Sequence, residues 1–335
     1  MGRSELQKGT ILHFPEGRSF EVLETIGGGG SALLYEVKEL GSERRFAIKE
    51  LYPSDGFVRQ NGQIVPLSRK YSLAALKQTL KEREVLLSRQ ASRRNHQVLT
   101  VLSPVWERVD MILPEGKRYD GVENTYVCKE SLRNKGMTLG AFLAQQRREK
   151  KVSLVTALDV MDTVLDAYDT LHEDGFIHCD CQKENLFLRQ AEGGVGTACI
   201  IDFDSARELQ EDGLTAPVTD DIFATDGYCA PELLLHEDGF RMSPACDIWS
   251  LGFLLLELLT DRGMEGQRNL TEHLILQPSE RRLSQWEAQG LGCTPAQKQM
   301  LDTIMKKAMA VEPEARYPHA GAMREAVQRL RLTIS

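Results

Sequence analysis

Residues 176–204 read FIHCDCQKENLFLRQAEGGVGTACIIDFD, and this stretch decides both the fold class and the chemistry expected of the chain. Two apolar runs, 176–177 and 199–201, each lead into polar residues: Asp180 and Asn185 follow the first, and Asp202 follows the second. Apolar runs bury themselves, so polar groups at their ends can be held rigidly at a surface. Phosphoryl transfer needs such an arrangement, because one carboxylate accepts a hydroxyl proton while an amide and a second carboxylate hold Mg²⁺.

The stretch resembles two loops of the protein kinase family, whose pattern is His-Arg-Asp-x-x-x-x-Asn followed by Asp-Phe-Gly. The spacing from Asp180 to Asn185 fits that pattern, and so does the Asp202-Phe203 pair. The resemblance implies that Asp180 is catalytic, and that Asn185 and Asp202 bind the metal ion and the nucleotide. Further motifs follow in the family's order over residues 18–332.

A glycine-rich turn lies between two stretches that alternate as strands do, 18–26 and 33–37. Strand, glycine turn, strand is typical of the hairpin that covers nucleotide phosphates in kinases. By the resemblance, Gly27 and Gly29 match the family's first two glycines and bind the cofactor. Four consecutive glycines also suit a flexible turn, and only the position upstream of the next motif favours phosphate binding.

Lys49 ends the strand expected over 45–49 and resembles the family's phosphate-pairing lysine. A solvated strand lysine is the alternative unless an acid lies within reach. The helix expected over 73–89 supplies one, because Glu84 falls on its apolar stripe of leucines. A buried carboxylate needs a partner, so we expect an ion pair between Lys49 and Glu84.

An insertion over residues 52–70 separates Lys49 from that helix. Its residues 57–65 predict a hairpin about an Asn-Gly turn. A docking or a regulatory role for this insertion stays open. The remaining strands are expected over 98–109 and 122–130.

The chain after residue 204 resembles the activation segment and large lobe of kinases. Thr225 stands where Ser/Thr kinases carry threonine, which implies a protein substrate with Ser or Thr hydroxyls. The helix expected over 247–259 is apolar nearly all round, as buried helices are. By the resemblance, Arg316 pairs with Glu232 of the Ala-Pro-Glu motif, a geometry that suits arginine and carboxylate.

Three residues of the catalytic and metal-binding loops depart from the family pattern. Cys179 replaces the arginine that receives an activation-segment phosphate, which predicts activity independent of that phosphorylation. Gln182 replaces a lysine that neutralises the transferred phosphate, a loss of about 10²- to 10³-fold in rate unless Lys183 reaches the site. Asp204 replaces a glycine; it either restricts the loop or adds a metal ligand.

The charge, hydropathy pattern and cysteine content of the chain do not favour a nucleic-acid-binding, membrane-spanning or disulfide-bonded protein. The net charge of −8 does not favour binding to nucleic acid. The longest apolar run, 248–259, is too short to span a membrane. Seven cysteines without paired CxxC units are typical of free thiols in a reducing compartment, which indicates the cytoplasm.

The sequence therefore predicts an α+β, two-lobed protein kinase-like fold with a small β-rich N-lobe and a larger, mainly helical C-lobe. The expected boundaries are an extension over 1–17 and a kinase domain over 18–332, divided near residue 130. The expected activity is ATP- and Mg²⁺- or Mn²⁺-dependent phosphorylation of protein Ser/Thr. Two alternatives stay open: a pseudokinase scaffold that binds nucleotide or protein partners, and a small-molecule kinase of the same fold.

Overall fold

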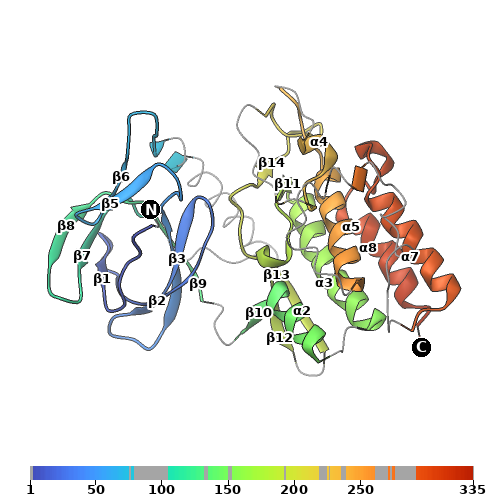
Figure 1. Ribbon diagram of the computed structural model, residues 1–335, viewed down its shortest axis with the longest axis horizontal. Helices are drawn as coiled ribbons and strands as arrows, with labels where there is room; N and C mark the ends of the chain where they lie inside the picture. Colours follow the sequence, from blue (N-terminus) through green and yellow to red (C-terminus); the bar gives the residue numbers. More distant parts are fainter. Residues whose placement is uncertain are drawn as a thin grey trace. The chain divides into compact units, whose positions relative to one another are not determined.

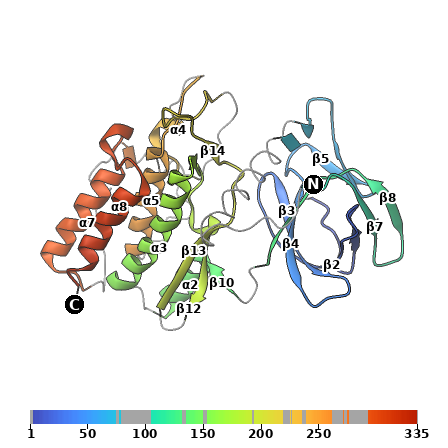
Figure 2. The ribbon, with the colours of Figure 1, turned by 180° about the vertical axis from the view of Figure 1, so that it is seen from behind.

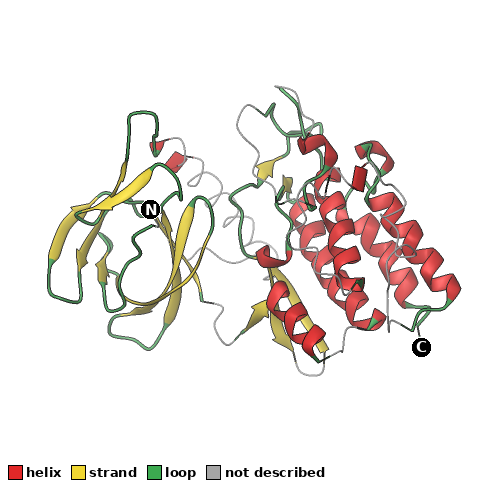
Figure 3. Cartoon of the chain, viewed as in Figure 1, coloured by secondary structure: helices red, strands yellow, loops and turns green. Residues whose placement is uncertain are grey.

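The chain separates into a β-rich part and a mainly helical part (Figure 3). This computed structural model describes residues 3–74, 77–78, 105–131, 135–149, 153–191, 194–218, 225, 227–234, 239–260, 271, 274–275 and 292–334. Two compact units, Met1–Arg133 and Asn134–Ser335, make up the chain. The predicted α+β class is confirmed.

The first unit is built on one antiparallel seven-stranded sheet with the order β8-β7-β1-β2-β3-β4-β9 (Figure 1). The strands predicted from alternation correspond to β2, β3, β4 and β9. Residues 1–17, expected as an extension, contain β1 in the middle of the sheet. The strand expected over 98–109 lies mostly outside the described residues, and the strands found next are β7 and β8. The bounds are β1 (Ile11–His13), β2 (Ser19–Gly28), β3 (Ala32–Glu39), β4 (Arg45–Leu51), β7 (Val109–Ile112), β8 (Arg118–Val122) and β9 (Tyr126–Glu130).

The insertion forms the predicted hairpin, with β5 (Phe57–Gln60) paired to β6 (Gln63–Pro66). Asn61 and Gly62 connect the strands with φ angles of 50° and 84°. A two-residue turn of this kind needs positive φ at both positions, which Asn-Gly supplies at low cost. The Asn-Gly prediction is confirmed.

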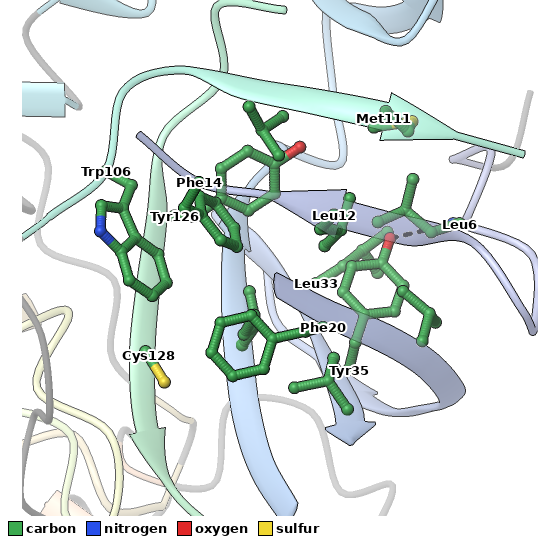
Figure 4. Packing of buried hydrophobic residues seen from close by; sticks show 14 of the residues in the cluster. Leu6, Leu12, Phe14, Phe20, Leu33, Tyr35, Trp106, Met111, Tyr126 and Cys128 are labelled. Carbon is green, nitrogen blue, oxygen red and sulfur yellow. Dashed lines mark hydrogen bonds between the residues drawn. The ribbon is translucent and has the colours of Figure 1, made fainter. Parts of the chain in front are cut away.

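One apolar cluster fills the first unit and joins its strands (Figure 4). Alternate residues of each strand point to the same side of the sheet, so β1, β2 and β3 present their apolar positions together. Phe14, just after β1, stacks on Trp106 with ring centroids 3.9 Å apart. Figure 4 labels the main members, which are Leu6, Leu12, Phe14, Phe20, Leu33, Tyr35, Trp106, Met111, Tyr126 and Cys128.

The second unit is organised around α3, which packs against α8 on one side and β13 on another (Figure 2). α5 is buried along its whole length, as its apolar sequence predicted. None of the described helices is long and apolar enough to cross a membrane. The helices are α2 (Leu139–Arg148), α3 (Leu154–Glu173), α4 (Pro231–Leu234), α5 (Ala245–Leu259), α7 (Pro295–Ala308) and α8 (Ala320–Arg331), with short 3₁₀ turns η1 (Lys183–Asn185) and η4 (Pro313–Ala315).

Two small sheets complete the second unit and carry the loops of interest. One has the order β10-β12-β13, and the other pairs β11 with β14. Their strands are β10 (Gly136–Thr138), β11 (Phe176–Ile177), β12 (Leu186–Ala191), β13 (Gly194–Ile200) and β14 (Arg207–Glu208). The loop between β11 and β12 contains Asp180 and Asn185, and the loop after β13 contains Asp202.

Candidate active site

The loop of residues 178–185 is placed by the end of α3 and by β11. Gly175, just past α3, has a φ of 82°, and the chain reverses there into β11. Glycine adopts this left-handed conformation without the penalty that a side chain brings. Cys179 also has a positive φ, of 66°. A non-glycine residue in this region needs surrounding contacts to hold it there.

Asp247, at the start of α5, supplies those contacts. Its Oδ2 accepts the His178 amide and its Oδ1 accepts the Cys179 amide, both at 2.8 Å. His172 donates from Nε2 to Oδ2 at 3.0 Å. Burial disfavours the charged carboxylate, but these donors outweigh burial and lower the pKa of Asp247. A fully buried, ionised carboxylate therefore fixes the loop backbone. Asp247 was not among the predicted site residues, although an acid at the start of a nearly all-apolar helix indicates a buried carboxylate that needs partners.

The Asp180 carboxylate is oriented by donors from three positions of the chain. Asn185 Nδ2 lies 2.8 Å from Asp180 Oδ2 and 2.9 Å from the Asp180 carbonyl oxygen. Gln182 Nε2 lies 3.1 Å from the same Oδ2. The Thr225 hydroxyl donates to Oδ1 at 3.0 Å. This carboxylate thus accepts a hydrogen bond from an alcohol, which is the geometry that a base for hydroxyl groups requires.

Asp202 is tied to the same loop through its backbone. The Ile201 amide donates to the Asn185 carbonyl at 3.0 Å, so Asp202 comes one residue after a contact with Asn185. His178 donates from Nε2 to the carbonyl oxygen of Asp202 and accepts the Asp180 amide at Nδ1. The structure therefore brings Asp180, Asn185 and Asp202 into one connected set.

The donor atoms of this set suit a hard divalent cation. Asn185 directs both amide hydrogens at Asp180, so its side-chain oxygen is the atom with which it would bind a metal. Asp202 adds a carboxylate, one oxygen of which also accepts the Asp204 amide at 3.2 Å. Mg²⁺ takes oxygen ligands and commonly uses one or two protein groups together with phosphates and water. These residues fit that ion.

Lys183 is held in a buried ion pair with Glu257. Its Nζ donates to Glu257 Oε1 of α5 at 2.6 Å, and the side chains are only 9% and 2% exposed. The Tyr228 hydroxyl donates to the other oxygen, Oε2, of the same carboxylate. Burial, followed by the charge of Glu257, raises the pKa of Tyr228 far above its ordinary value. Lys183 is thus engaged with Glu257, and neutral Gln182 stands at the position of the family's phosphate-neutralising lysine.

The predicted pair of Arg316 and Glu232 is confirmed. The two carboxylate oxygens of Glu232 accept from Nη1 and Nη2 of Arg316 at 2.7 and 2.6 Å. Arg316 also donates to the carbonyls of Ala245, Ala310 and Val311. One guanidinium thus joins α4, the start of α5 and the turn after α7.

Residues 210–218, in the stretch that resembles an activation segment, are docked on residues 240–242. Arg241 binds the Asp212 carboxylate through both Nη atoms, at 2.8 and 2.9 Å, and donates from Nε to the Thr215 carbonyl at 2.7 Å. Thr215 is buried, and its hydroxyl accepts the Met242 amide at 3.0 Å. Cys179 Sγ lies 3.9 Å from Met242 Sδ. The residue at the position of the family's phosphate-receiving arginine thus packs against an apolar side chain.

In the first unit, Gly27 and Lys49 fall in one row across the sheet. Leu34 of β3 is the register partner of both, Gly27 on β2 and Lys49 on β4. Glu84, the partner predicted for Lys49, lies outside the described residues. A side chain at Gly27 or Gly29 would meet no atom within 4 Å in the described part of the chain, whereas one at Gly28 would collide with Leu33 at 2.8 Å. A Cβ atom at Gly28 would therefore push the end of the Leu33 side chain aside, a contact that sequence reasoning did not single out.

These motifs agree with comparisons to known proteins. The family model of the protein kinase domain matches residues 20–328, so the chain belongs to the protein kinase family. Serine/threonine-protein kinase PknA of Nostoc is 26% identical over 314 residues, which are 92% of this chain and 47% of that protein. PknD of Chlamydia muridarum is 24% identical over 333 residues, 92% and 31% of the two chains.

Shorter and structural matches are consistent with that membership. Serine/threonine-protein kinase PknJ of Mycobacterium tuberculosis is 31% identical over 183 residues, 52% of this chain and 28% of that protein. The chain thus spans less than half the length of these three curated relatives. The solved structure described as PpkA-294 apo form covers 96% of this chain and 99% of its own, with a TM-score of 0.65 and 23% identity. At that identity the likeness concerns the fold alone.

Proposed function

We propose that this chain is an ATP-dependent Ser/Thr protein kinase whose activation segment is ordered without phosphorylation. The observation that carries the catalytic part is the Asp180 carboxylate, which is oriented by Asn185 and Gln182 and accepts a hydrogen bond from the Thr225 hydroxyl. The names of the relatives, all serine/threonine-protein kinases, support the substrate class.

Each predicted site residue has a proposed role. Asp180 orients and deprotonates the substrate hydroxyl. Asn185 and Asp202 hold Mg²⁺ or Mn²⁺, which when bound neutralises phosphate charge. Gly27 and Gly29 offer backbone N–H groups to the phosphates of ATP, and Lys49 pairs with them. For Lys49 we keep the proposed partner Glu84, which completes the expected catalytic set.

Two contacts support independence from phosphorylation. A phosphorylated activation segment needs a basic receiver, and Cys179, at the family's receiver position, packs on Met242. The Asp212 carboxylate instead gives Arg241 a permanent anionic partner within the segment. Thr215, a threonine of this segment, is buried with its hydroxyl engaged. A second threonine of the segment, Thr219, lies outside the described residues.

The catalytic proposal is tested by transfer of radiolabelled phosphate from γ-labelled ATP with Mg²⁺ or Mn²⁺. The wild-type chain, Asp180→Asn and Asp202→Asn are compared on a generic basic protein. We expect phosphate transfer to depend on both Asp180 and Asp202, because loss of a general base alone lowers the rate about 10²- to 10⁴-fold. Equal labelling by wild type and Asp180→Asn would refute the proposal.

The regulatory proposal is tested on protein treated with a nonspecific phosphatase and verified by mass spectrometry. We expect the treated chain to keep its full rate. Asp212→Asn is expected to lower the rate, whereas Glu211→Gln, which removes the charge of the exposed neighbouring acid, leaves it unchanged. A treated chain that loses activity, and regains it on rephosphorylation, would overturn this part.

A second candidate function, a pseudokinase scaffold, is favoured by one observation. Gln182, which contacts Asp180, is neutral, and Lys183 forms an ion pair with Glu257. A chain that ATP stabilises against heat without any label transfer would support this candidate. A small-molecule kinase is less favoured, because the resemblance assigns Thr225, Glu232 and Arg316 to the floor on which peptides dock.

The cellular location is proposed from the cysteines. All seven are free thiols, and six of them are buried. Free thiols are typical of a reducing compartment, so we place the protein in the cytoplasm.

A further inference from the structure

The N-terminal segment, residues 3–10, runs along the edge of the glycine-rich hairpin formed by β2 and β3. Near its end, the Gly9 amide donates to the Val22 carbonyl, and the Val22 amide donates to the Thr10 carbonyl, both at 2.8 Å. In its middle, Leu6 is buried and its amide donates to the Tyr35 hydroxyl at 3.2 Å, the dashed contact in Figure 4. Thr25 of β2 donates to Glu5 at 2.7 Å. The segment is thus anchored to the same two strands that carry the glycine turn.

Arg3 closes this segment onto the turn itself. Its Nη1 lies 2.8 Å from the Gly29 carbonyl and 2.9 Å from the carbonyls of Ala32 and Tyr52. Its Nη2 lies 3.3 Å from the position that a Cβ atom at Gly28 would occupy. A charged donor that binds carbonyls on both sides of the turn restrains the backbone of residues 28–32.

The inserted hairpin holds this segment in place. Arg59 of β5 donates from Nε to the Ser4 carbonyl at 2.9 Å, next to Arg3. The same guanidinium binds both oxygens of Glu50, at 2.9 and 2.6 Å, with Glu50 fully buried. Glu50 follows Lys49 on β4 and also accepts from the hydroxyls of Tyr126 and Tyr35. A continuous set of contacts therefore runs from the strand of Lys49, through the insertion, to the glycine turn.

We propose that Arg3 is a positioning residue for nucleotide binding, and that the β5–β6 insertion is the support that holds it there. The inference rests on the proposed function, in which Gly27 and Gly29 bind phosphates. A turn restrained before ATP arrives loses less conformational entropy on binding, so its affinity for phosphate is higher. In the described part of the chain, Arg3 binds carbonyl oxygens of this turn and of Tyr52, so the role we propose for it is to restrain the turn.

The test uses the full chain and four proteins: wild type, Arg3→Ala, Arg3→Lys and Lys8→Ala. Lys8 is exposed on the same segment, so its variant controls for loss of one positive charge. ATP affinity is measured by isothermal titration with Mg²⁺, and restraint of the turn by hydrogen–deuterium exchange at residues 27–33. We expect Arg3→Ala to bind ATP about tenfold more weakly, because the unrestrained turn must then become ordered on binding. In Arg3→Ala, hydrogen–deuterium exchange should be faster at the turn and unchanged in β4 and β9. Arg3→Lys should fall between wild type and Arg3→Ala in both ATP affinity and exchange.

Two results would overturn the inference. One is wild-type affinity and wild-type exchange in Arg3→Ala. The other is faster exchange throughout the sheet, which would make Arg3 a residue of general stability. If the wild-type chain binds no ATP, the proposed function fails, and the exchange comparison alone decides whether Arg3 restrains the turn.

Discussion

Lys183 can be assigned to a structural or a catalytic role by one perturbation. If its ion pair with Glu257 is structural, Lys183→Met leaves a carboxylate that is 2% exposed without its cation. Breaking a buried pair by removing one partner costs about 3–5 kcal/mol in the free energy of unfolding. If Lys183 instead serves the transferred phosphate, the same change lowers turnover and leaves stability intact.

The double variant Lys183→Met/Glu257→Gln sharpens the test. It removes both charges, while glutamine keeps an acceptor for the Tyr228 hydroxyl that contacts Glu257. Replacing both members of a buried pair with neutral groups is often close to neutral. We therefore expect the double variant to recover at least about 2 kcal/mol of the loss, a coupling of the size found for residues in contact.

The assay combines urea unfolding with label transfer at saturating ATP. Lys306→Met, an exposed lysine on α7, is the control and should change neither quantity. Unchanged stability with a large loss of turnover in Lys183→Met would refute the structural role. A double variant as unstable as the single one would show that the two side chains do not depend on each other.

Three further changes test other contacts of the second unit. Gln182→Lys restores a cation beside Asp180 and is expected to raise turnover in the label-transfer assay by up to about 10²-fold; a lower rate would count against that reasoning. Arg316→Met leaves Glu232, whose side chain is 12% exposed, without its partner, and should lower the urea-derived stability by about 3–5 kcal/mol. The lowered pKa of Asp247 means that its stabilising effect is present above the ordinary value of 3.8 and is lost as pH falls below it. Asp247→Asn should therefore be much less stable than wild type at pH 7 and differ less at pH 3, and a constant difference would contradict this.

The sequence was sufficient to predict a structural feature where the signal for that feature is local or belongs to a family pattern. The Asn61-Gly62 turn follows from two residues, and the buried α5 follows from one apolar run. The pairing of Arg316 with Glu232 joins residues far apart in the chain and came from the resemblance. The Lys49–Glu84 pair stays a prediction, because Glu84 lies outside the described residues.

The contacts that were missed share one physical feature. Glu257 and Glu50 are acids in segments that bury every side chain around them, and each is held by a cation from elsewhere, Lys183 or Arg59. Burial of a carboxylate requires a partner, for these two acids as for Glu84 in the prediction. It indicates that a partner exists, but it does not identify the partner, because the register of loops and insertions is set by tertiary packing.

The central position of β1 bears on how this protein is handled in the laboratory. β1 pairs with β2 on one side and β7 on the other, and Phe14 next to it stacks on Trp106. The match to the family model begins only at residue 20. A recombinant fragment trimmed to that boundary would lose the strand between β2 and β7 and expose two unpaired edges. Open edges recruit strands from other molecules, so such a truncation is expected to aggregate during expression.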